Sequence, residues 1–155
     1  MEKKLIFVSF KNDNDKYNSY IDVDSFLSTG DDIELIMKKA ASIYNNMIIK
    51  MKNKINEIAE YRRKRCPLPT RKIWELGDII FKLVEDLKEL SLQIDGIYSH
   101  LERDLNVKRK WLEKVIILRR YVPEEAMIPE YLNWSKCEKG TRRVSEQIKN
   151  GIIPK

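Results

Sequence analysis

The side chains of this chain that could do chemistry are mostly cations, and they concentrate between Asn106 and Tyr121. This stretch holds six basic residues and one acid, Glu113; the basic residues are Lys108, Arg109, Lys110, Lys114, Arg119 and Arg120. A focused cluster of cations can neutralise the phosphates of a polyanion, so it favours a nucleic-acid partner. The alternative is an ordinary helix pair with a solvated basic face, because charge runs are common on helices.

Two helices joined by a short turn are expected to position these cations. Apolar residues recur at helical spacing before Asn106 and again after Val107: Ile94, Ile97, Tyr98, Leu101 and Leu105, then Trp111, Leu112, Val115, Leu118 and Val122. The pattern predicts a helix-turn-helix with Val107 at its corner. Its second helix begins where a recognition helix meets the major groove, so Arg109 and Lys110 are expected to reach base edges. Phosphates are the expected partners of Lys108, Lys114, Arg119 and Arg120.

The net charge of +6 is unevenly distributed along the chain. Residues 1–60 sum to −1 and residues 61–155 to +7. A second basic segment runs from Tyr61 to Lys72 without an acid, and includes Arg62, Arg63, Arg65, Arg71 and Lys72. It is either an arm that follows phosphates or the basic end of a helix, which the helix dipole favours in any case. Arg142 and Arg143 could add a flanking contact to the DNA backbone.

No set of residues in the sequence indicates an active site. His100 is the single histidine, and Cys66 and Cys137 lack metal-binding spacing. Neither a glycine-rich phosphate loop nor a GxSxG motif occurs. Asp22 and Asp24 could share a strand face, but no catalytic lysine or histidine follows them. The sequence therefore predicts a non-enzymatic protein without a metal or a cofactor, with reduced thiols and a cytoplasmic location.

The N-terminal part, residues 1–66, is predicted to serve dimerisation or interaction. Lys4–Phe10 and Tyr17–Val23 are both prone to form strands and predict a short β-hairpin. A long helix is expected from Asp31 to just before Cys66-Pro67. An isolated hairpin is marginally stable in water, and so long a helix exceeds one small core. We therefore expect a homodimer.

The remaining part, residues 67–155, is predicted to be the DNA-binding domain. A second long helix is expected from Thr70, and a short helical piece over Glu124–Ile128. A capping box at Ser135–Glu138 predicts a last helix that ends near Asn150-Gly151. The three tryptophans are expected to be core residues, since tryptophan carries the largest apolar area. The predicted fold class is mainly α: a helical bundle containing a helix-turn-helix, with a short N-terminal β-hairpin.

Four short motifs in this part resemble a known family. They are Trp74-Glu75-Leu76-Gly77, Leu101 with Asp104-Leu105, Leu118-Arg119-Arg120-Tyr121, and Leu132-Asn133-Trp134-Ser135. Together they resemble the N-terminal domain of YhcG-type proteins, over roughly Thr70 to Ile148. The resemblance implies a helical DNA-binding domain, which in that family precedes a PD-(D/E)xK nuclease domain. No nuclease domain is expected within this sequence, and the family pattern does not predict residues 1–66.

These observations predict a double-stranded DNA-binding protein that acts as a regulator or a DNA-targeting subunit. Its expected partners are duplex DNA, a second copy of the chain, and a separate nuclease or other effector subunit. No apolar run is long enough for a membrane span, so no membrane association is expected. The alternative is a helical interaction or assembly subunit that does not bind DNA directly.

Overall fold

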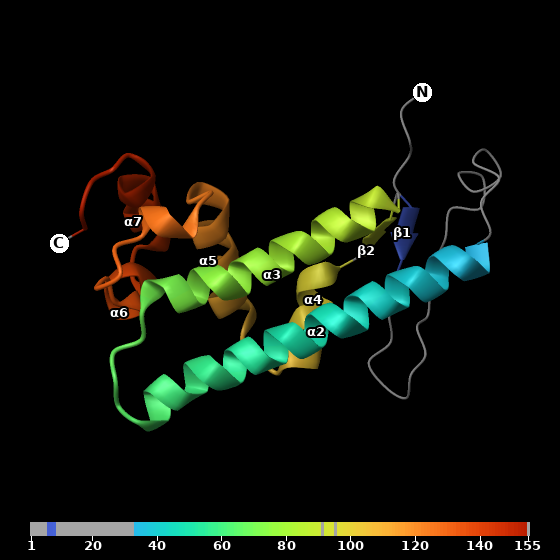
Figure 1. Ribbon diagram of the computed structural model, residues 1–155, viewed down its shortest axis with the longest axis horizontal. Helices are drawn as coiled ribbons and strands as arrows, with labels where there is room; N and C mark the ends of the chain where they lie inside the picture. The colour runs from blue at the N-terminus through green and yellow to red at the C-terminus, as the bar shows by residue number, and fades with distance from the viewer. Residues whose placement is uncertain (1–5, 9–32, 91, 95, 155) are drawn as a thin grey trace. The chain divides into compact units, whose positions relative to one another are not determined.

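The computed structural model describes residues 6–8, 33–90, 92–94 and 96–154, and most of these residues are helical (Figure 1). The mainly α fold class is confirmed. The elements follow one another as β1 (Ile6–Val8), α2 (Ile33–Arg63), α3 (Thr70–Glu89), β2 (Leu92–Ile94), α4 (Ile97–Leu105), α5 (Arg109–Tyr121), the 3-10 helix η1 (Glu125–Met127), α6 (Trp134–Glu138) and α7 (Thr141–Lys149).

The strand β1 pairs in parallel with β2, with Ile6 opposite Leu92 and Val8 opposite Ile94. Parallel strands need a long crossover connection, and the chain that contains α2 and α3 supplies it. The second strand of the predicted hairpin, Tyr17–Val23, lies outside the described residues. Ile94 belongs to β2, so its predicted place in the helix-turn-helix was wrong.

The chain divides into two compact units, and both long helices contribute to each of them. The first unit comprises residues 1–49 and 82–107, and the second unit comprises residues 50–81 and 108–155. The predicted ranges 1–66 and 67–155 therefore do not correspond to these units, because α2 and α3 each pass from one unit to the other.

The first unit has an apolar core with a polar cluster beside it. Met37, Ala40 and Tyr44 of α2 are buried there, as are residues of α3 and α4 that include Leu83, Leu87, Leu101 and Leu105. The Tyr44 hydroxyl donates a hydrogen bond to the Asp104 carboxylate. Burial and this hydrogen bond raise the pKa of Tyr44, so the hydroxyl stays protonated and continues to donate.

His100 is buried in this unit, with 8% of its surface exposed. Arg103, one turn along α4, donates to His100 Nδ1 at 2.9 Å. An arginine cannot accept a hydrogen bond, so Nδ1 is the acceptor in this pair.

The second unit is built on the N-terminal part of α3. Its core includes Ile73, Leu76 and Ile80 of α3 with residues of α5, α6 and α7 that include Leu112, Val115, Leu118, Trp134 and Val144. Trp74 is buried and donates from Nε1 to the Val122 carbonyl at 2.7 Å. Trp74 and Trp134 are therefore core residues, as predicted, whereas Trp111 is half-buried.

The last part of the chain forms two short helices where we predicted one. α6 has Asn133 as its N-cap, so the predicted capping box at Ser135 was wrong. α7 starts after Gly140, a residue type that disfavours helix interiors because its backbone is so free. The Thr141 hydroxyl donates to the Glu138 carbonyl at 3.3 Å and fixes this corner. The predicted helical piece after Pro123 is present as η1.

Gly77 allows α3 and α5 to approach closely, which predicts a destabilising effect of alanine there. A Cβ atom at Gly77 would lie 2.8 Å from Arg119 Cβ and 3.0 Å from the Val115 carbonyl oxygen. Overpacking of this kind costs about 1–3 kcal/mol, against a gain of up to about 1 kcal/mol in helix propensity. We expect Gly77→Ala to lower the free energy of unfolding in urea by about 1–2 kcal/mol. Lys88→Ala, on the exposed end of α3, is the control, and an equally stable Gly77→Ala protein would contradict this packing.

Candidate nucleic-acid interface

The two units of the structure differ more in net charge than residues 1–60 and 61–155 do. The second unit contains 21 Lys and Arg against 10 Asp and Glu, which gives +11. The first unit contains 9 Lys and Arg against 14 Asp and Glu, which gives −5. A polyanion would therefore be attracted to the second unit and repelled by the first.

The three-residue connection between α4 and α5 places the basic start of α5. Asn106 caps α4 in a left-handed conformation, with φ 53°, and its backbone N–H donates to the Glu102 carbonyl. Val107 is half-buried, and Lys108 is extended and precedes the first residue of α5. Both predicted helices and the turn are thus present near the expected positions, with α4 in the first unit and α5 in the second.

The first turn of α5 combines cations with the N-terminal backbone N–H groups of a helix. Lys108, Arg109 and Lys110 are all exposed, no acid occupies this turn, and no side chain caps it. The first N–H groups of a helix lack intrahelical acceptors, and the dipole makes this end positive. Three cations at the positive end repel one another and the dipole, and a bound anion would relieve that repulsion. Arg109 lies 3.6 Å from Glu113 in an exposed pair.

Other predicted cations lie on the surface of the same unit. Lys114 is half-buried and Arg120 is exposed on α5. Arg142 and Arg143 are exposed on α7, which packs against α5. Arg142 lies 3.6 Å from Glu146, and its guanidinium carbon is 5.9 Å from the centre of the Tyr121 ring.

Arg119 forms internal contacts that disagree with its predicted role as a phosphate ligand. Its Nε donates to the Asp78 carboxylate at 3.0 Å. The guanidinium also lies over the rings of Phe81 and Trp74, at 4.3 and 5.0 Å from their centres, and the side chain is 15% exposed. We therefore reassign Arg119 to the packing of α5 on α3. The spacing of Trp74, Asp78 and Phe81 on one face of α3 was the sequence signal for this partner.

Arg71 and Lys72 are also engaged inside the second unit. Arg71 donates to the Ile128 carbonyl at 2.7 Å, and Lys72 lies 2.6 Å from the Glu57 carboxylate. Arg62, Arg63 and Arg65 remain exposed at the end of α2. The first two lie in the last helical turn, where cations favour the helix dipole, and Arg63 pairs with Glu60.

A cluster of charged side chains joins α2, α3 and η1 in the same unit. Lys54 lies 2.9 Å from Glu57 and 2.8 Å from Glu75, and Lys72 also lies near both acids. Hydrogen bonds from Lys72 and Lys54 lower the pKa of Glu57. Burial and the neighbouring Glu75 carboxylate raise the pKa of Glu125, although Arg71 and Lys72 partly oppose this.

The raised pKa of Glu125 predicts a pH-dependent stability effect. The Glu125 carboxyl group binds its proton more tightly in the folded protein than in the unfolded chain. Its contribution to the stability of the fold is therefore lost as pH rises through its folded pKa. We expect Glu125→Gln to be about 0.5 kcal/mol more stable than the parent at about pH 7.5, and nearly equal to it at about pH 4. Protonation of Glu57 destabilises both proteins at the lower pH, so thermal midpoints are compared at each pH. Exposed Glu124→Gln should show no such difference. Equal stability of Glu125→Gln and the parent at both pH values would contradict a raised pKa of Glu125.

Neither a metal site nor a membrane-spanning helix is found in the described part of the chain. No three His, Cys, Asp or Glu residues there come together to hold an ion. None of its helices is long and apolar enough to cross a bilayer. The resemblance to YhcG-type proteins stays a prediction. No family model, curated protein or solved structure matches this chain.

Proposed function

We propose that this protein binds double-stranded DNA, non-enzymatically, through the basic surface of its second unit. The observation that carries the proposal is the first turn of α5, where three exposed cations surround an uncapped helix N-terminus without an acid. Backbone N–H groups and cations at a helix N-terminus are the groups that hold phosphates in many proteins. The +11 charge of the unit supports the same partner.

Within this proposal, the residues divide by what they contact. Arg109 and Lys110 would contact base edges in the major groove, and Lys108 would hold a phosphate. Further phosphate ligands are Lys114, Arg120, Arg142, Arg143, Arg62, Arg63 and Arg65. Arg119, Arg71 and Lys72 act indirectly, because they hold α5, the segment after η1 and α2 against α3.

The biological setting completes the proposal. A cytoplasmic homodimer, formed through residues 1–66, would present two copies of α5 to duplex DNA. The protein would then regulate transcription or direct a separate nuclease or other effector subunit to DNA. The competing function is that of an assembly subunit without direct DNA contact. Leu35 and Ile49 favour it, because these two apolar residues of α2 are more than half exposed.

A salt titration of duplex binding tests the proposal. Fluorescence anisotropy of a labelled duplex is measured from about 50 mM to about 300 mM NaCl. We expect affinity to fall steeply, with a log–log slope of about −4 to −7, since each phosphate contact releases condensed counterions. An absence of binding at the lowest salt would favour the assembly subunit. Binding that ignores salt would contradict a phosphate-based mechanism.

A further inference from the structure

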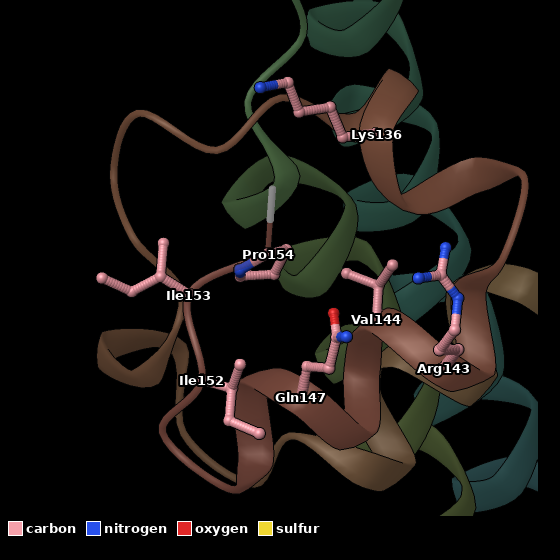
Figure 2. A pocket seen from close by; sticks show the side chains of 7 residues that line it. All are labelled: Lys136, Arg143, Val144, Gln147, Ile152, Ile153 and Pro154. Atoms are coloured by element: carbon pink, nitrogen blue, oxygen red, sulfur yellow. The ribbon is translucent and has the colours of Figure 1, made fainter.

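A cavity of about 270 Å³ opens between α6, α7 and the C-terminal segment of the second unit (Figure 2). Two cations, one amide and four aliphatic residues line it. Its lining consists of Lys136, Arg143, Val144, Gln147, Ile152, Ile153 and Pro154. No acid lines it, so no carboxylate in the lining neutralises the two cations. One ligand could therefore contact both the positive charge and the apolar surface.

The two cations of this cavity are available for an anion. Lys136 and Arg143 are exposed, and neither forms an ion pair with any residue that the structure describes. The Arg143 guanidinium lies against Gly140, where a Cβ atom would come within 3.3 Å of Nη2. A glycine at this corner therefore gives the guanidinium room beside the cavity. Figure 2 shows the Gln147 amide pointing into the same space.

The apolar side of the cavity is fixed by the way the chain turns after α7. Gly151 adopts a left-handed conformation with φ 75°, and the Ile152 N–H donates to the Gln147 carbonyl at 2.8 Å. Pro154 is buried, whereas Ile152 and Ile153 keep 54% and 62% of their surface exposed. The segment therefore folds back toward α7 and leaves aliphatic surface uncovered beside two cations.

We propose that this cavity binds a small organic anion: a carboxylate attached to a short aliphatic body. The carboxylate would accept hydrogen bonds from the Gln147 amide and from Lys136 and Arg143, which line the same cavity, since charge-assisted hydrogen bonds are the stronger ones. The body would cover Val144, Ile152 and Pro154 and remove their apolar surface from water. The volume is slightly below that of common ligand sites, so the ligand has on the order of ten non-hydrogen atoms. The cavity shares Arg143 with the proposed DNA surface, but binding of the anion does not require DNA.

Three probes separate the charge from the apolar contact. Hexanoate has a carboxylate and an aliphatic tail, acetate has the carboxylate without the tail, and 1-hexanol has the tail without the carboxylate. Amide chemical shifts of the full ¹⁵N-labelled chain are followed during each titration. We expect hexanoate to bind about tenfold tighter than either control, with the shifts centred on Val144, Gln147 and Ile152. Equal binding of acetate and hexanoate would indicate an adventitious ion only, and no shifts up to about 20 mM hexanoate would also overturn the proposal.

Variants then identify the groups that hold the probe. Lys136→Gln is expected to weaken hexanoate about tenfold, and this residue is not among the proposed DNA ligands. Arg143→Gln should have the same effect, whereas Arg142→Gln, on the same helix but outside the cavity lining, should have none. Ile152→Ser should weaken hexanoate and leave acetate unchanged. Parent-like hexanoate binding in both Lys136→Gln and Arg143→Gln would place the anion elsewhere.

Discussion

Replacing Lys108 and Lys110 together by glutamine is expected to weaken duplex binding about 10- to 100-fold at 0.1 M salt. Each phosphate contact contributes about 0.9 of a decade in affinity at this salt, relative to 1 M, through the counterions it releases. Loss of the Lys108 phosphate contact should therefore also make the log–log salt slope shallower by about one unit, and the base contact of Lys110 accounts for the rest of the loss. Both side chains are exposed, and neither forms an ion pair with a described residue, so the fold should tolerate the change.

A charge-matched control separates the first turn of α5 from the general charge of the second unit. Lys50 and Lys52 are exposed residues of α2 in the same unit, and their replacement by glutamine removes the same two charges. We expect this control to weaken binding less than about threefold, because screening limits distant charges. Equal losses in the two double variants would show that DNA is attracted to the unit as a whole, without a specific role for α5. Unchanged binding in the α5 variant would remove α5 from the interface.

The helices were predictable where local signals are strong. The apolar stripe after Asp31 and the prolines at positions 67 and 123 predicted α2 and the end of α5 closely. The pairing of β1 with β2 was not predictable in this way, because it joins three-residue segments more than eighty positions apart. The division into two units escaped prediction for the same reason, since each unit combines segments that are distant in the sequence.

The location of the cations was predictable, but their availability was not. Arg119 and Arg120 are neighbours in the sequence and look alike there. On α5 they point in different directions, so Arg119 meets Asp78 and two rings of α3 while Arg120 is exposed. Which face of α5 packs on α3 depends on Gly77, whose missing side chain admits the Arg119 stem. A count of charges carries no information about such a contact.

Alanine variants of the neighbouring residues Arg119 and Arg120 distinguish an effect on packing from an effect on DNA binding. Arg119→Ala removes a hydrogen-bonded pair with Asp78, two ring contacts and the packing of the side-chain stem. We expect the free energy of unfolding to fall by about 2–3 kcal/mol. Arg120→Ala should change it by less than about 0.5 kcal/mol, since this residue is exposed and forms no ion pair within the described ranges. Arg119→Lys should recover only part of the loss, because an ammonium group cannot stack as the planar guanidinium does.

DNA binding by the same variants should show the opposite order. Below their thermal midpoints, Arg120→Ala should weaken duplex binding and make the salt slope shallower by about one unit, as expected for a lost phosphate contact. Folded Arg119→Ala should keep the parent slope, because its guanidinium is held by Asp78 of α3. A shallower slope for Arg119→Ala, together with unchanged stability, would return Arg119 to the phosphate ligands. Such a result would also mean that the contacts with Asp78, Trp74 and Phe81 contribute little to the fold.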